Sequence, residues 1–219
     1  MIELKFKTFK RAPFFEIAKQ LIKGRDKILD IGAGEGSFAD YLQKLDIYLL
    51  EGNPASVAKL KKRYKNVFQG KLPDLPYENS FFDLIHISHV IEHLHPDDMY
   101  KTLKEMDRCC KPGGAIVVST PLFWSGFYND LSHIKPYDPL VLEKYFGALQ
   151  KPNSTREVIS KSYTVERLEY RYMEEIPDWN LYRCNGLVLF LLKVLTFLRR
   201  SIYKKYIRTG YTIVLRKAN

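Results

Sequence analysis

The chain of 219 residues is predicted to fold as a doubly wound α/β sheet with helices on both faces. Short apolar segments alternate along the chain with segments of helical periodicity, which is the pattern of a three-layer α/β/α domain. A glycine-rich turn follows the first apolar segment. The segment AIVVST, residues 115–120, is β-branched and apolar throughout, as expected for a parallel strand buried on both faces.

The first third of the chain contains three strand candidates, each preceded or followed by a helix. The expected elements are a helix over 13–23, a strand and glycine turn in KILDIGAGEG (27–36), a helix from Ser37 onward, a strand in DIYLLEGN and a weaker strand in NVFQG. Between the last two strands, Asn53 followed by Pro54 predicts a capped helix start. The second strand is expected to end at Glu51.

The rest of the chain continues the alternation. The expected elements are a strand at 82–88 (FDLIHIS), a helix through Met99, Leu103, Met106 and Cys110, the strand 115–120, a helix from Asp138-Pro139, a strand near 162–171, a helix at 186–206 and a final strand in GYTIVLRK. The helix after the fourth strand should stop at Lys111-Pro-Gly-Gly114. We expect one domain over 1–219, with an N-terminal helical segment 1–24 and an inserted basic and apolar helix 186–208.

The net charge of +10 is concentrated at the two ends of the chain. Residues 1–27 contain eight Lys/Arg and three Asp/Glu, and residues 186–219 contain eight Lys/Arg and no acidic residue. Residues 28–185 contain 19 basic and 22 acidic residues, a charge of −3. This distribution favours contact of the ends with an anionic partner, although a generally basic protein is the simpler interpretation.

The cysteine content indicates the compartment. Three cysteines, two of them adjacent, are few and odd in number, which argues against a disulfide framework. Charged residues break every apolar run in the first 27 positions, so no signal peptide is visible. We therefore expect a cytoplasmic protein, with a place on the inner face of the membrane as an alternative.

The glycine turn and a downstream acid predict a nucleoside site. Gly32, Gly34 and Gly36 form G-x-G-x-G, one residue shorter than the dinucleotide fingerprint, and Glu35 is unfavourable beside a phosphate. Glu51, expected at the end of the next strand, suits two hydrogen bonds to ribose hydroxyls. Asp30 before the turn strengthens the nucleoside interpretation.

Four segments together resemble the class I S-adenosylmethionine-dependent methyltransferases, in the branch of methyltransferase types 11 and 12. They are ILDIGAGEG, LLEGNP, FQGKLPDLPYENSFFDLIHISHVIEHL and LKEMDRCCKPGGAIVVSTP, and they cover about residues 25–122 in the family's order. The resemblance implies a Rossmann-like seven-stranded sheet whose last strand is antiparallel. It also implies S-adenosylmethionine as the methyl donor and S-adenosylhomocysteine as the product.

The resemblance also assigns cofactor-binding residues. It places Asp30, Gly32, Ala33, Gly34 and His89 around the methionine part, Glu51 on the ribose and Leu72 against the adenine. The chain departs from the family at Lys71, where an Asp is usual. The adenine amino group is then expected to meet Asp74 or backbone carbonyls instead.

The segment His89-Val-Ile-Glu-His93 spells H-x-x-E-H, the inverted zinc-peptidase motif. A peptidase would carry it in the middle of a long helix, whereas here it follows the fourth strand at the mouth of the expected cofactor cleft. We therefore reject the peptidase interpretation. Glu92 and His93 are expected to line or support the acceptor pocket, with His133 or His93 as the catalytic base.

A metal-dependent alternative stays open. Small-RNA 2′-O-methyltransferases use a cluster spelled E-x-x-E-H with a further histidine, which His89, Glu92, His93 and His133 resemble with one Glu changed to His. We assign no metal ligand, and keep a metal-dependent RNA 2′-O-methyltransferase as an alternative. The segment FYNDLSHIKPYDPLVLEKYF instead resembles methyltransferases that act on cell-surface glycans.

The function predicted from the sequence is therefore O-methylation of a glycan, lipid-linked or other small-molecule acceptor. The apolar stretch 187–198 is too short to span a bilayer, and a basic cluster follows it, so it could lie on an anionic membrane. Packing on the domain or at a homodimer interface is the other interpretation. A third possibility is an adaptor at a membrane that binds S-adenosylmethionine without catalysis.

Overall fold

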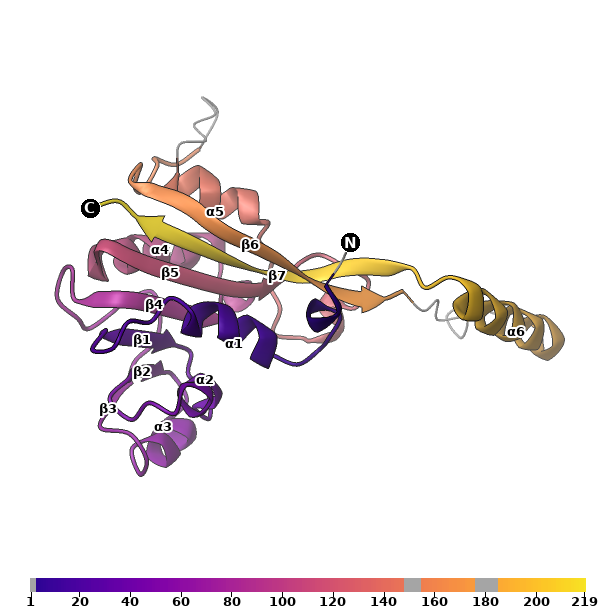
Figure 1. Cartoon of the computed structure of the whole chain (residues 1–219), viewed down its shortest axis with the longest axis horizontal. Coiled ribbons are helices and arrows are strands. Elements are labelled where there is room, and N and C mark those ends of the chain that lie inside the picture. Colours follow the sequence, from indigo (N-terminus) through magenta and orange to yellow (C-terminus); the bar gives the residue numbers. More distant parts are fainter. Residues whose placement is uncertain (1–2, 148–154, 176–184) are drawn as a thin grey trace.

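A computed structural model describes residues 3–147, 155–175 and 185–219 (Figure 1). Seven strands form one sheet in the order β3-β2-β1-β4-β5-β7-β6. The strands are β1 Ile28–Ile31, β2 Tyr48–Glu51, β3 Asn66–Gln69, β4 Phe82–Ser88, β5 Cys110–Pro121, β6 Tyr163–Glu174 and β7 Tyr206–Lys217. The predicted seven-stranded sheet is confirmed.

Strand direction determines where the loops of the site meet. The five strands β1 to β5 pair in parallel, and β7 is antiparallel to both β5 and β6. The carboxyl ends of β1, β2, β4 and β5 consequently lie along one edge of the sheet. This carboxyl edge is where ligands bind in open α/β sheets.

Helices cover both faces of the sheet, because the strand residues alternate between two apolar clusters. On β5, Ile116 and Val118 join the cluster that contains α4 and α5, while Val117 joins the cluster that contains α1, α2 and α3. The helices are α1 Ala12–Lys19, α2 Ser37–Leu42, α3 Pro54–Leu60, α4 Pro96–Cys109 and α5 Pro139–Phe146. This is the predicted three-layer arrangement.

Some element boundaries differ from the prediction. Helix α1 ends at Lys19 rather than at 23, because the next amides bond three residues back, from Leu21 to Ala18 and from Ile22 to Lys19. Strand β5 begins at Cys110, since its first residue already pairs with Phe82 of β4. Cys109 and Cys110 are buried and form no disulfide, while Cys184 lies outside the described residues.

The largest difference is a ribbon that β6 and β7 form beyond the rest of the sheet. The pairing of β5 with β7 stops at Pro121 and Gly210, whereas the pairing of β6 with β7 continues to Glu174 and Tyr206. The 17-residue helix α6, Gly186–Ile202, lies at the far end of this ribbon (Figure 1). Within the described ranges, no helix has the length and apolar character required to cross a membrane.

The predicted cap of α3 is confirmed and gives a test of local stability. Asn53 Oδ1 accepts hydrogen bonds from the amides of Ala55 at 2.8 Å and Ser56 at 3.4 Å. Asn53→Ala removes both bonds and should lower the free energy of unfolding by about 1 kcal/mol in a denaturant titration. Lys61→Ala, an exposed change at the other end of α3, is the control and should be nearly neutral. An equal loss in both variants would contradict the cap.

Candidate active site at the carboxyl edge

A cavity of about 390 Å³ opens at the carboxyl edge, where β1, β2 and β4 end. Of the residues predicted to bind the cofactor, Gly32, Glu51, Leu72 and His89 line it. The other lining residues are Ile31, Leu50, Gly52, Gly70, Lys71, Val90, His93 and Leu94. The cavity therefore combines a glycine turn, one carboxylate and several apolar walls.

The Glu51 carboxylate holds the glycine turn against the end of β2. Its Oε2 accepts the Gly34 amide at 2.7 Å, and its Oε1 accepts the Asn53 amide at 2.8 Å. The turn is also anchored by the amides of Gly32 and Ala33, which both donate to the Leu50 carbonyl. Each carboxylate oxygen keeps lone-pair capacity for a further donor in the cavity.

Asp30 and Ala33 are buried and do not line this cavity. Asp30 Oδ1 lies 2.7 Å from His86 Nδ1, and the His86 ring stacks on Phe38 with the ring centroids 3.8 Å apart. Asp30 thus ties β1 to β4 beneath the glycine turn. A role of its carboxylate toward the methionine part stays a prediction.

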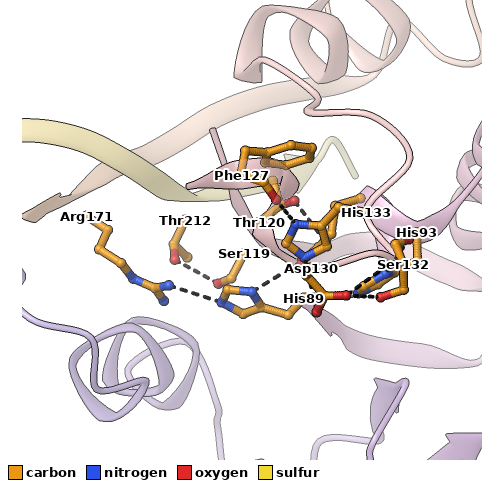
Figure 2. Close-up of polar contacts among 11 residues, drawn as sticks. His89, His93, Ser119, Thr120, Phe127, Asp130, Ser132, His133, Arg171 and Thr212 are labelled. Carbon is orange, nitrogen blue, oxygen red and sulfur yellow. Dashed lines mark hydrogen bonds and ion pairs between the residues drawn. The ribbon is translucent and has the colours of Figure 1, made fainter. Parts of the chain in front are cut away.

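The H-x-x-E-H segment lies in a loop and a short 3-10 helix, η2 Ile91–His93, and helix α4 starts only at Pro96. His89 has a positive φ of 56° and connects β4 to this loop. Its Nε2 accepts from Arg171 Nη1 at 3.2 Å, and its Nδ1 lies 3.2 Å from Glu92 Oε1 (Figure 2). Burial lowers the pKa of His89, so the neutral ring fits both contacts.

Glu92 is a fully buried carboxylate at the centre of this edge. Its Oε2 accepts the Thr120 hydroxyl at 3.0 Å, and its carbonyl accepts the amides of Ile134 and Lys135. Burial is the largest influence and raises the pKa of this carboxyl, but the contacts with His89, a backbone amide and His93 together outweigh it, so the pKa lies below its ordinary value. Glu92 therefore stays charged and joins the ends of β4 and β5 to the loop that carries His133.

The two histidines predicted as bases lie side by side, with ring centroids 5.0 Å apart. His93 Nδ1 bonds the Ser132 carbonyl at 3.0 Å, and His133 Nδ1 bonds the Phe127 carbonyl at 2.6 Å (Figure 2). A carbonyl only accepts, so each Nδ1 carries a proton and Nε2 is the nitrogen that can accept one. His93 lines the cavity. His133 is not among the lining residues and lies next to the short 3-10 helix η3, Phe127–Asn129.

Sequence reasoning missed three side chains that shape this site. Thr120 and Arg171 hold Glu92 and His89, and Asp130 Oδ2 lies 4.0 Å from His133 Nε2. Bonds from the Ser132 hydroxyl and amide lower the pKa of Asp130, so its charge faces the histidine. The NDLSH segment contained Asp130 and the strand end contained Thr120, but no local pattern pointed to Arg171, which reaches His89 from β6.

Glu92, His93 and His133 also form a group that could hold a metal ion. One potential ligand atom from each lies within 4.8 Å of the others. His89, the fourth residue of the sequence-based alternative, is outside this group, because its ring nitrogens face Glu92 and Arg171.

Comparison with known proteins identifies the domain that carries this edge. Residues 29–118 match the family model described as a methyltransferase domain. The chain is 36% identical over 102 residues to a "Probable S-adenosylmethionine-dependent methyltransferase" of Mycolicibacterium smegmatis, covering 45% of this chain and 38% of that protein. It is 33% identical over 109 residues to a sarcosine/dimethylglycine N-methyltransferase of Aphanothece halophytica, covering 44% and 38%.

The fold comparison covers more of the chain. A solved structure of an S-adenosylmethionine-dependent methyltransferase from Archaeoglobus fulgidus aligns with a TM-score of 0.62 at 20% identity, over 94% of this chain and 92% of that one. The chain spans less than two fifths of the length of the two relatives above. Residues 29–118 therefore carry a match to a methyltransferase domain, and the strand order and glycine turn agree with the fold of the Archaeoglobus fulgidus methyltransferase structure.

Proposed function

We propose that this chain transfers a methyl group from S-adenosylmethionine to a hydroxyl of a glycan, lipid-linked or other small-molecule acceptor. The observation that carries the proposal is the position of His93. Its ring lines the same cavity as Gly32 and Glu51, so a base and the expected cofactor residues share one space. When bound, S-adenosylmethionine would supply an electrophilic methyl carbon whose leaving group is the neutral thioether of S-adenosylhomocysteine.

The cavity fits the cofactor at three points. Glu51 is oriented by two backbone amides and can accept two ribose hydroxyls. Leu72 and Leu94 supply apolar walls for a base, and Lys71 stands beside them. Gly32 has a φ of +69°, and a Cβ there would lie 2.3 Å from Val90 Cγ2, so the backbone itself forms this wall.

The two histidines favour a hydroxyl over an amine acceptor. A neutral amine attacks through its own lone pair, whereas a hydroxyl must lose its proton as the methyl group is transferred. His93 and His133 each present an Nε2 lone pair, and Asp130 would stabilise the imidazolium that forms on His133. The relative from Aphanothece halophytica is named for amine acceptors, so this geometry argues for a different acceptor here.

A metal-dependent RNA 2′-O-methyltransferase is the second candidate, and one observation favours it. Glu92 Oε1 is buried and accepts no well-aligned hydrogen bond among the described residues, although His89 Nδ1 lies 3.2 Å away. With the Nε2 lone pairs of His93 and His133, this oxygen would complete a set of nitrogen and oxygen ligands. The carbonyl contacts at both Nδ1 atoms are the kind that orient metal-binding histidines.

The glycine turn gives a test of the cofactor site. Gly32→Ala should push Val90 into the cavity and weaken S-adenosylmethionine binding by about tenfold or more, as measured by calorimetry. The matched control is Gly24→Ala, which also has a positive φ but no neighbour within 4 Å of the added Cβ. Equal affinity in both variants and the parent chain would contradict the proposed cofactor site.

The catalytic role is tested at His133. In an assay with labelled cofactor and fractionated cell extract, His133→Ala should lower turnover by about 10²–10⁴-fold and leave cofactor affinity nearly unchanged. His95→Ala, at an exposed histidine just before α4, is the matched control and should keep full turnover. Unchanged turnover in His133→Ala would remove this residue from the chemistry. Cofactor binding with no transfer to any fraction would favour the adaptor.

Metal removal separates the two candidate functions. If a histidine is the base, incubation with EDTA should leave both turnover and cofactor binding unchanged, because no step needs an ion. Loss of turnover that is restored by one added divalent ion would favour the RNA methyltransferase instead. Metal analysis of the purified chain and of Glu92→Gln provides a readout that does not depend on activity.

A further inference from the structure

Helix α6 carries an apolar stripe that no other part of the described structure covers. Six side chains along one face recur at the spacing of an amphipathic helix, and each is between 38% and 70% exposed. They are Leu187, Val188, Leu191, Val194, Leu195 and Leu198. A stripe of this kind on an isolated helix normally marks a surface that meets a partner or a lipid.

Away from the stripe, Lys193 shares the helix surface with Phe190 and Phe197, which are 62% and 69% exposed. Lys193 lies about 160° around the helix from both Leu191 and Leu195 at 100° per residue. The whole segment 186–219 contains eight Lys/Arg and no Asp/Glu. Three of these charges are already compensated, because Lys205 pairs with Glu175 at 2.6 Å, Arg216 with Glu166 at 2.7 Å and Lys217 with Asp107 at 2.8 Å.

The ribbon holds α6 on the side of the molecule where the active site opens. Because β7 is antiparallel to β5, its first residues, Tyr206–Thr209, extend beyond the carboxyl end of β5 at Pro121. Figure 1 shows α6 projecting away from the sheet on this side. At the root of the ribbon, a second cavity of about 460 Å³ is lined by aromatic side chains that include Trp124, Tyr172 and Tyr206.

We propose that α6 lies in the surface of an anionic lipid bilayer, with its apolar stripe among the acyl chains and its basic residues at the headgroups. The helix is amphipathic and rich in leucine, as interfacial helices are. The ribbon tethers α6 to the side of the sheet where the active site opens (Figure 1). Docking would therefore keep the active site near the bilayer and a lipid-linked acceptor, a consequence that rests on the proposed function.

Charge argues for lipid rather than a second copy of the chain. Two α6 helices packed stripe to stripe would bring together segments that contain basic residues and no acidic residue to pair with them. An anionic bilayer covers the same apolar stripe and attracts the basic side chains, by about 1 kcal/mol for each one near the surface. An anionic bilayer therefore accounts for both the exposed apolar stripe and the basic residues of this segment.

The test is co-sedimentation of the full chain with vesicles of equal parts phosphatidylcholine and phosphatidylglycerol. The parent chain should bind these vesicles and bind pure phosphatidylcholine more weakly. Leu191→Ser combined with Leu195→Ser should weaken partitioning about tenfold or more, because two exposed apolar side chains are lost without any change in the core. Lys193→Glu should weaken binding to the anionic vesicles only.

Leu45→Ser is the matched control, since Leu45 is 68% exposed before β2 and far along the chain from α6. It should partition like the parent chain. Equal partitioning of the parent chain and the double leucine variant would overturn the proposal. The proposal would also be overturned if the parent chain formed a dimer, the double variant were monomeric, and neither bound vesicles. Binding of the parent chain to single-stranded RNA but not to vesicles would overturn it as well. Calorimetry with S-adenosylmethionine should be equal in all variants, which separates this outcome from failure of the proposed function.

Discussion

A charged carboxylate with no exposed surface, that of Glu92, holds the acceptor side of the site together. Burying a carboxylate is costly unless donors surround it. Thr120 from the end of β5 and the neutral ring of His89 from the end of β4 are those neighbours. The Glu92 carbonyl also fixes the amides that follow His133. Three segments distant in the sequence therefore depend on one ionised group, which explains why H-x-x-E-H follows a strand here without forming a peptidase site.

The contacts around Glu92 also determine which ring nitrogens of the neighbouring histidines have partners. Burial keeps His89 neutral, and Arg171, whose own pKa burial lowers to about 10, donates to its Nε2. His89 is thus occupied on both nitrogens and serves as a structural link. His93 and His133 are fixed through Nδ1 only, so their Nε2 atoms are the ones available for a proton or an ion. His89 and His93, four residues apart, therefore differ in whether a ring nitrogen is left available.

The sequence predicted the alternation of strands and helices through local patterns, and its resemblance to a known family implied the seven-stranded sheet with an antiparallel last strand. The continuous apolar run of β5, the Asn53 cap and the glycine turn are each visible within a few residues. It could not predict contacts set by strand register. Arg171 reaches His89 from β6, where it pairs with Gly210 of β7 opposite Pro121, the last residue of β5. The pairing of β6 with β7 continues beyond this point and starts the last strand at Tyr206 rather than at Gly210. Asp30, which the motif assigned to the cofactor, is bonded to His86.

The energetics of α6 fit a reversible attachment. Its six stripe residues are already partly shielded, so burying the remaining surface contributes on the order of 1 kcal/mol each. The loss of translational and rotational freedom on binding offsets part of this free energy. A 17-residue helix that lies flat in the bilayer surface is also held less tightly than a transmembrane helix. Electrostatic attraction to anionic lipid then decides whether the chain stays bound. For the lipid-linked acceptor proposed above, this balance would favour release of the methylated product, because tighter anchoring would limit access to new acceptors.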